Sequence, residues 1–224
     1  MANGTDSSRK ISETRFTVVD TELTGLDAKR DAIISVGAVR MTGGRIEISD
    51  SFYRLVNPDK ELKAPGVIIH EITSEDLLQK PGIDEVLAEF TGFYGSDVIV
   101  GYCVEIDMEF LNREMKRIFG APIRNSVIDI YPLYEWARSR TFFEERTTTM
   151  PGRAKLYDIA RHYDIAVNGA HNALVDAFIT AQVFQRLIPL LSAAGITNMG
   201  ELMRLCGRLK GGDRQGISSG ISNF

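Results

Sequence analysis

The chain has 224 residues, of which 44% are hydrophobic and 25% are charged, and its formal net charge is −4. This composition is ordinary for a folded globular chain, and the acidic balance argues against a general nucleic-acid coating protein. An uninterrupted run of about 18 apolar residues is absent, so we expect no membrane-spanning helix and no membrane partner.

The chain also gives no sign of secretion. Its first ten residues lack the apolar centre of a secretory signal. Cys103 and Cys206 lie far apart and indicate neither a disulfide framework nor a zinc site. A reducing, cytoplasmic location is therefore expected.

The first predicted strand, residues 16–23, carries two acids inside an apolar, β-branched stretch. Asp20 and Glu22 should point to the same face of this strand, roughly 6–7 Å apart, because side chains alternate along a strand. Two such carboxylates repel each other and are costly to desolvate. Divalent cations would offset that cost; alternatively, the strand end reaches water.

The next elements read as a hairpin followed by strand–helix alternation. We expect strands at 32–41, 46–56, 98–100 and 127–130, and helices near 74–79, 83–94, 106–118, 133–138, 154–163 and 172–191. This order predicts an α/β layered domain.

The helix at 106–118 carries an acid on its apolar side. Phe110, Leu111, Met115 and Ile118 form one helical stripe, and Asp107 lies on that same stripe. An acid there is unusual, although the helix dipole also favours an acid near a helix N-terminus.

The long helix at 172–191 carries another such acid. Asp176 shares a helical face with Ala173, Ala177 and Thr180, so it should face the packed side. His171 precedes Asp176 by five residues, where a loop leads into the helix. A lone histidine is more often structural, but one beside a buried acid is a candidate general base.

With these four acids and one histidine, the chain resembles the 3′–5′ exonucleases of the DEDDh type, which include the proofreading epsilon subunit of bacterial DNA polymerase III. The resemblance covers roughly residues 16–191 and rests on three motifs, at 19–27, 100–111 and 169–177. A sister group carries Tyr four residues before its last Asp. Asn172 stands there in this chain, so the His subtype is indicated.

The resemblance implies a ribonuclease-H-like fold with a mixed five-stranded sheet and a two-metal hydrolysis. Asp20, Glu22, Asp107 and Asp176 would hold two divalent cations, Mg²⁺ or Mn²⁺, about 4 Å apart. His171 would take the proton from the attacking water, and the product would be a nucleoside 5′-monophosphate. By position in the motifs, the terminal nucleotide would be lined by Thr21, Leu23, Thr24, His70 and Ile72, for which simple packing or loop solvation is the alternative.

The chain departs from the pattern at several positions. Many relatives carry His-Asn at Tyr102-Cys103, Thr at Leu23 and Gly at Glu71. Tyr102-Cys103 and Leu23 supply no metal-binding carboxylate, so these departures bear on substrate preference rather than on the chemistry. The negative charge of Glu71, near a substrate phosphate, would weaken binding or discriminate among substrates. Six basic side chains between 138 and 161 form either a phosphate-contacting loop or a solvated one.

Three functions remain open. The favoured one is a metal-dependent 3′–5′ exonuclease on single-stranded DNA ends, either free-standing or associated with a DNA polymerase subunit. The second moves the substrate to RNA 3′ ends or short oligoribonucleotides, and the third is a non-catalytic nucleic-acid-binding module. The implied organisation is a disordered lead-in at 1–14, the exonuclease domain at 15–191, and a helix with a flexible tail at 192–224. Both a monomer and a homodimer are compatible with the sequence.

Overall fold

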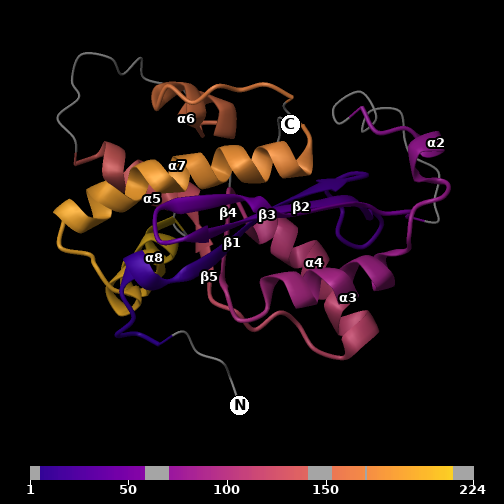
Figure 1. The fold of residues 1–224 in the computed structure, drawn as a ribbon, viewed down its shortest axis with the longest axis horizontal. Helices are drawn as coiled ribbons and strands as arrows, with labels where there is room; N and C mark the ends of the chain where they lie inside the picture. The colour runs from indigo at the N-terminus through magenta and orange to yellow at the C-terminus, as the bar shows by residue number, and fades with distance from the viewer. Residues whose placement is uncertain (1–5, 59–70, 141–152, 170, 214–224) are drawn as a thin grey trace.

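The computed structural model describes residues 6–58, 71–140, 153–169 and 171–213. A five-stranded sheet in the order β3-β2-β1-β4-β5 forms its centre (Figure 1). β1 is antiparallel to β2 and parallel to β4, so the sheet is mixed. The strands are β1 (Arg15–Leu23), β2 (Ile33–Thr42), β3 (Arg45–Leu55), β4 (Val98–Gly101) and β5 (Val127–Asp129). The predicted α/β class and mixed five-stranded sheet are confirmed.

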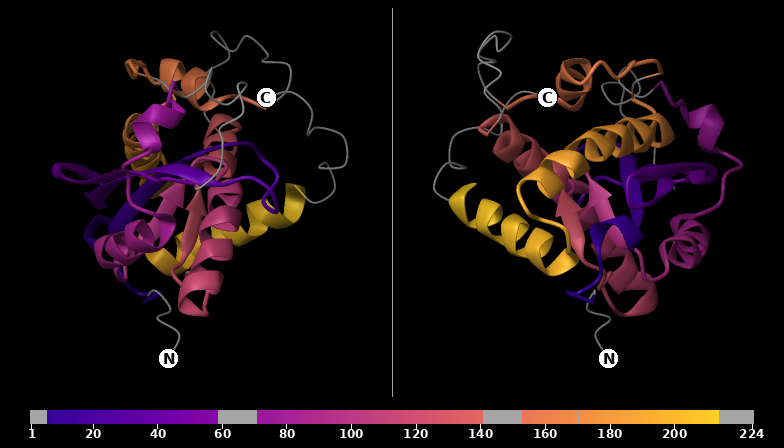
Figure 2. Two further views of the ribbon diagram at one scale, coloured as in Figure 1. Left: turned by 90° about the vertical axis from the view of Figure 1, so that its right-hand side faces the viewer. Right: turned by 60° about the vertical axis from the view of Figure 1, so that its left-hand side comes forward.

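Helices cover both faces of this sheet (Figures 1 and 2). One core cluster joins the sheet to α5 (Ile130–Arg138), α6 (Leu156–His162), α7 (Ala173–Ala193) and α8 (Met199–Asp213). A second cluster joins the opposite face to α3 (Ile83–Tyr94) and α4 (Glu105–Phe119). Two short elements complete the set, the 3₁₀ turn η1 (Ile11–Glu13) and α2 (Ser74–Leu77). The central strand β1 is therefore covered on both sides.

The first turns of α4 and α7 carry the predicted acids. The side chain of Asn172 caps α7 by accepting hydrogen bonds from the backbone N–H groups of Leu174 and Val175. Asp129 caps α5 in the same way, which is why the helix begins at Ile130, a residue expected at a strand end. Asp107 and Asp176 thus lie where the helix dipole is positive.

A glycine opposite Asp20 lets α7 approach the sheet closely. Gly37 on β2 pairs with Asp20 on β1 and with Tyr53 on β3. A Cβ at Gly37 would lie 2.2 Å from backbone atoms of Ala173 and Leu174. The bare backbone of Gly37 therefore brings the first turn of α7, with Asp176, against the strand that carries Asp20.

We expect Gly37→Ala to displace the start of α7. The clash is with backbone, so overpacking should lower the free energy of unfolding by about 1–3 kcal/mol. Urea unfolding would measure the change. Gly92→Ala is the matched control, because a Cβ there meets nothing within 4 Å and alanine favours a helix. Equal stability of the two variants would contradict the close approach.

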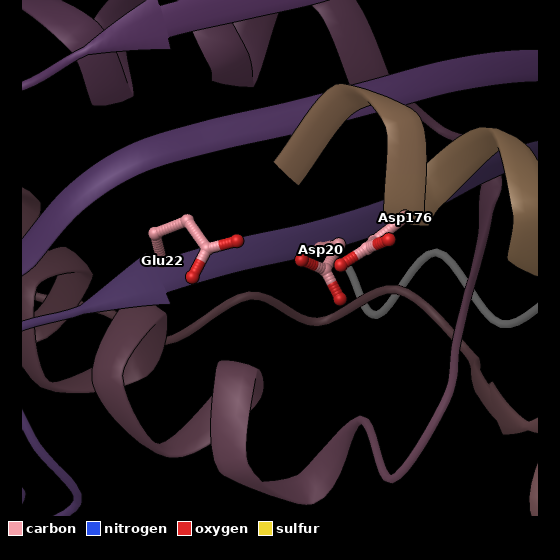
Figure 3. Close-up of side chains that lie close together, drawn as sticks. All are labelled: Asp20, Glu22 and Asp176. Atoms are coloured by element: carbon pink, nitrogen blue, oxygen red, sulfur yellow. The ribbon is translucent and has the colours of Figure 1, made fainter. Parts of the chain in front are cut away.

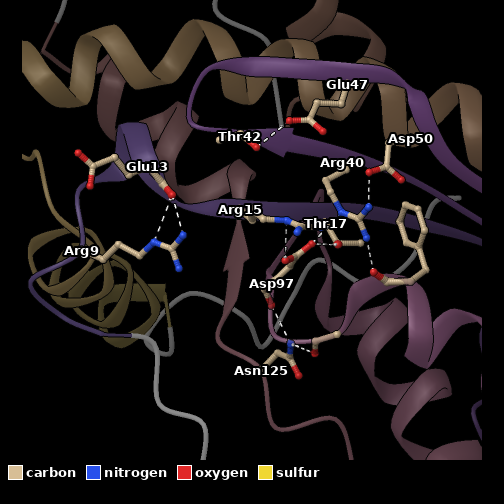
Figure 4. A network of polar contacts seen from close by, with 12 residues as sticks. Arg9, Glu13, Arg15, Thr17, Arg40, Thr42, Glu47, Asp50, Asp97 and Asn125 are labelled. Carbon is tan, nitrogen blue, oxygen red and sulfur yellow. Dashed lines mark hydrogen bonds and ion pairs between the residues drawn. The ribbon is translucent and has the colours of Figure 1, made fainter.

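A buried ionic network lies at the other end of β1 (Figure 4). Asp97 accepts hydrogen bonds from Arg40 at 3.1 Å and from the Thr17 hydroxyl at 3.0 Å, and it pairs with Arg15 at 3.3 Å. Arg40 also pairs with Asp50 and donates to the carbonyl of Phe93. This network ties β2 to the turn before β4, and it shows a buried acid whose charge is fully matched.

The described part of the expected lead-in is held by the fold. Ile11 is buried, and its N–H donates to the carbonyl of Thr197. The N–H groups of Met199 and Gly200 donate to the carbonyls of Arg9 and Ser7. Residues 6–14 are therefore ordered, whereas a disordered lead-in was expected. Their pairing with residues 197–200 joins distant parts of the chain, so the composition of the segment alone could not predict it.

The C-terminal helix α8 also packs on the domain. Met199, Leu202, Leu205 and Cys206 belong to the same core cluster as α7. Among the described residues, α7 alone is long and apolar enough to span a membrane by length and mean hydropathy. It packs along β1 and β2, as the core helix of a layered domain does.

Candidate metal-dependent nuclease site

Three carboxylates meet at the end of β1. Asp20 and Glu22 lie on one face of this strand, and Asp176 reaches them from the first turn of α7 (Figure 3). One oxygen of each carboxylate lies within 4.8 Å of the others. The predicted shared face of Asp20 and Glu22 is thus present, and α7 adds the third acid from a position 154 residues beyond Glu22 in the chain.

The fourth predicted acid, Asp107, is tied to the same strand. Its Oδ1 accepts hydrogen bonds from the Thr21 backbone N–H at 2.9 Å and from the Thr21 hydroxyl at 2.6 Å. Thr21 stands between Asp20 and Glu22, so these bonds fix the first turn of α4 beside both. Asp107 is buried, as its place on the apolar stripe predicts.

Burial raises the pKa values of all four acids, and repulsion from neighbouring acids of the site adds to the shifts of Asp20 and Glu22. Burial, followed by repulsion from Asp107, Asp176 and Glu22, raises the pKa of Asp20 well above its ordinary value. Burial, with repulsion from Asp176 and Asp107, raises the pKa of Glu22 to about 8. Burial also raises the pKa of Asp107 to about 7, against the hydrogen bonds from Thr21. Close carboxylates that lack a counter-charge disfavour their charged forms.

The acids fit divalent cations. Asp176 Oδ1 is buried, and it has no hydrogen-bond partner among the described residues. Asp97, by contrast, has two arginines and a hydroxyl. Mg²⁺ and Mn²⁺ prefer oxygen ligands, and a divalent charge would offset the repulsion that raises these pKa values. Asp20, Glu22 and Asp176 are the residues whose converging oxygens would hold such an ion.

We expect the protein in EDTA to become less stable as pH rises from about 5 to about 8. The raised pKa of Glu22, about 8, means that the folded state holds a proton that the unfolded state has released. Rising pH therefore costs stability in this window, until the folded acid also ionises. Thermal melting at several pH values would measure the slope. Glu22→Gln should flatten it, whereas Glu109→Gln, an exposed acid on α4, should keep the wild-type slope. A Glu22→Gln slope equal to that of the wild type would contradict this expectation.

His171 lies directly beside Asp176. Its backbone N–H is 3.2 Å from Asp176 Oδ2 and donates to the Tyr157 hydroxyl at 2.9 Å. The side chain is exposed and its ring packs edge-on against Tyr157, with ring centroids 5.3 Å apart. His171 has φ of +63°, a left-handed conformation that is uncommon outside glycine. The exposed imidazole therefore stands at the rim of the acid cluster.

Tyr157 on α6 is the site neighbour that sequence reasoning missed. Its hydroxyl donates to Asp176 Oδ2 at 2.7 Å. The residue lies in a short helix with Leu156, Ile159 and Ala160 on the buried side. The sequence shows only a polar aromatic residue beside an apolar helical stripe, which says nothing about its partner.

The residues predicted to line the terminal nucleotide have other contacts in the structure. Thr21 is bonded to Asp107, and the Thr24 hydroxyl donates to Asp31 and accepts from the N–H of Ala32. Leu23 packs on the α3–α4 side, and Ile72 packs with Ile34 and Leu77. His70 lies outside the described residues. Nucleotide contact at these positions stays a prediction.

The departing pair at the second motif has structural contacts. The Tyr102 hydroxyl donates to the carbonyl of Ala154 at 2.6 Å, and the N–H of Cys103 donates to Asp129 at 3.0 Å. Burial raises the pKa of the Cys103 thiol to about 12. The reactive form of cysteine is the thiolate, so this thiol is unsuited to be a nucleophile.

Most of the basic residues before the third motif pair with an acid or stack on an aromatic ring. Arg138 pairs with Glu135, and Arg161 pairs with Asp158. The guanidinium groups of Arg140 and Arg153 stack on the rings of Trp136 and Tyr131. Lys155 is exposed, and Arg146 lies outside the described residues. A phosphate-contacting role for this segment stays a prediction.

A mixed sheet with helices on both faces, and acids gathered at the end of its central strand, defines a nuclease of ribonuclease-H-like architecture. The family model RNase_T, described as an exonuclease, matches residues 17–184. The chain belongs to this exonuclease family, and the predicted family and nuclease class are confirmed.

Two relatives illustrate the similarity. DNA polymerase III subunit epsilon of Aquifex aeolicus is 34% identical over 175 residues, which cover 77% of this chain and 80% of the relative. The PolC-type DNA polymerase III of Thermotoga maritima is 33% identical over 197 residues, or 87% of this chain. The chain spans only 13% of that relative's length.

Solved structures share the fold at lower identity. Escherichia coli exonuclease I in complex with a dT13 oligonucleotide superposes with a TM-score of 0.68 at 18% identity, over 81% of this chain and 42% of that one. Exonuclease X in complex with 5′ overhanging duplex DNA has a TM-score of 0.59 at 22% identity, over 87% and 98% of the two chains. At such identities the likeness shows the fold alone.

Proposed function

We propose that this chain is a metal-dependent 3′–5′ exonuclease that hydrolyses the terminal phosphodiester of single-stranded DNA and releases nucleoside 5′-monophosphates. The observation that carries the proposal is the convergence of Asp20, Glu22 and Asp176 within 4.8 Å, with His171 beside Asp176. A binding module would gain nothing from acids that repel each other and also repel a phosphate.

Each residue has a proposed role. Asp20, Glu22, Asp107 and Asp176 hold two divalent cations, which supply charge neutralisation at the phosphate and a lowered pKa for water. His171 accepts the proton of the attacking water at its exposed imidazole. Thr21 fixes Asp107 through two hydrogen bonds and keeps its carboxylate beside Asp20.

DNA is the favoured substrate because the curated relatives are named as DNA polymerase III components and exonuclease I was solved with an oligodeoxynucleotide. We further propose that the chain works with a DNA polymerase as a proofreading exonuclease. In the PolC-type relative of Thermotoga maritima, which is named as a DNA polymerase III, the matching region is 13% of a much longer chain.

The test is degradation of matched single-stranded DNA and RNA oligomers, each labelled at the 5′ or the 3′ end. Reactions contain Mg²⁺, Mn²⁺ or EDTA. A metal-dependent ladder that shortens from the 3′ end, faster on DNA than on RNA, is the expected result. A faster rate on RNA would move the substrate to oligoribonucleotides, since a pocket that accepts or excludes the 2′-OH decides between them. No cleavage of either polymer would overturn the proposal.

A further inference from the structure

Tyr157 links the two residues on which the proposed chemistry depends. It lies in the first turn of α6, whose Leu156, Ile159 and Ala160 are buried in the core. The helix is thus anchored by neighbours of Tyr157, while the Tyr157 side chain is only half-buried and extends toward the acid cluster. Its hydroxyl contacts Asp176 and the backbone of His171.

The hydrogen bonds of this hydroxyl are directional. A carboxylate can only accept, so the phenolic O–H donates to Asp176 Oδ2 at 2.7 Å. The hydroxyl oxygen in turn accepts the N–H of His171 at 2.9 Å. Both capacities of the hydroxyl are therefore used on residues five positions apart. The bond to Oδ2 leaves Oδ1 as the atom of Asp176 without a partner among the described residues.

The same contacts hold His171 in place. Its backbone adopts φ of +63°, which costs free energy for a residue with a side chain. Two acceptors, the Tyr157 hydroxyl and Asp176 Oδ2, hold the N–H in that conformation. The rings of Tyr157 and His171 also pack edge to face, with their centroids 5.3 Å apart and their planes at 88°.

We propose that Tyr157 is a positioning residue, which orients the Asp176 carboxylate toward the cation and fixes His171 as the base. This inference rests on the proposed function and names a residue outside the acid–histidine set. A half-buried tyrosine with a merely structural role would contribute through its ring, whereas the proposed role is exerted through the hydroxyl and its hydrogen bonds to Asp176 and His171. The two can be separated because phenylalanine keeps the ring.

Tyr157→Phe is the test variant, and Tyr163→Phe is the matched control. Tyr163 directly follows α6 and is also half-buried, but its ring packs against Tyr134 and His162, away from the acids. We expect Tyr157→Phe to lower kcat by about 10–100-fold, as loss of a residue that orients a metal ligand commonly does. KM for the oligonucleotide should change less than about 3-fold, because the hydroxyl is engaged with protein groups.

Two further measurements test the mechanism of the effect. In a His171→Asn background, Tyr157→Phe should lower kcat by a clearly smaller factor than it does in the wild type, since part of its effect is exerted through His171. Titration of the metal-free protein with Mn²⁺ should show weaker binding by Tyr157→Phe and unchanged binding by Tyr163→Phe. Circular dichroism and melting temperature would establish that all variants are folded.

The inference is overturned if folded Tyr157→Phe keeps kcat and Mn²⁺ affinity within about 2-fold of the wild type. It is also overturned if two results occur together: Tyr157→Phe lowers kcat by the same factor in the wild type and in the His171→Asn variant, and its affinity for Mn²⁺ is unchanged. A wild-type chain that cleaves no oligonucleotide would overturn the proposed function, and the Mn²⁺ titrations would still decide whether Tyr157 orients Asp176. The two failures are therefore distinguishable.

Discussion

Asp20→Asn is expected to lower the rate of exonuclease cleavage by more than about 10³-fold. Asp20 lies between Glu22 on its own strand and Asp176 on α7, and its oxygen belongs to the set within 4.8 Å. An amide has nearly the same shape as the carboxylate but lacks the negative charge that a divalent cation requires. Single-turnover cleavage of a 5′-labelled single strand at saturating Mn²⁺ would measure the loss.

The same substitution should stabilise the protein in EDTA. Repulsion from Asp107, Asp176 and Glu22 contributes to the raised pKa of Asp20, and removing one charge relieves that repulsion. A higher melting temperature at pH 8 together with lost activity would mark a functional acid, because a structural acid would lose stability when replaced. Asp84→Asn, at an exposed acid in the first turn of α3, should leave activity unchanged and should not raise the melting temperature. Near-normal activity of Asp20→Asn would show that the metal assignment is wrong.

His171→Asn is expected to lower the rate at neutral pH by about 10²–10⁴-fold, the usual contribution of a general base. Asparagine is chosen because it tolerates positive φ better than most residues, and His171 has φ of +63°. The loop conformation and the backbone N–H to Asp176 should therefore survive while the imidazole is lost. The measurement is kcat near pH 7, with Mn²⁺ affinity as the second readout.

The matched control for this variant is His162→Asn. His162 is exposed at the end of α6 and contacts Tyr134 and Tyr163, not the acids. We expect wild-type kcat for His162→Asn and nearly unchanged Mn²⁺ binding for both variants. If His171→Asn cleaved at the wild-type rate, His171 would be excluded as the base.

Much of this fold could be predicted from the sequence because its signals are local. An apolar, β-branched stretch marked β1, and the apolar stripe that includes Asp107 marked α4. The faces of Asp107 and Asp176 followed from helical periodicity, and both side chains are buried in the structure. Acids at core-facing positions are rare, so their unusual placement was itself the signal.

The remaining features depend on contacts between distant segments. Gly37 reads as an ordinary strand glycine until Ala173 is brought against it, and Tyr157 has no local feature that names Asp176 as its partner. The pairing of residues 6–14 with 197–200 is equally non-local. Such contacts depend on the packing of the whole domain, so neither the secondary-structure propensity nor the hydrophobic periodicity of one segment can predict them.

The open sheet has two edges, and both are poor templates for another strand. β5 at one edge has only three residues. β3 at the other edge carries Arg45, Glu47, Asp50 and Arg54, and its register with β2 shifts between Val39 and Arg40. Charges and irregular pairing at an edge discourage aggregation through strand addition. The edge strands can therefore stay unpaired without another copy of the chain adding a strand to the sheet.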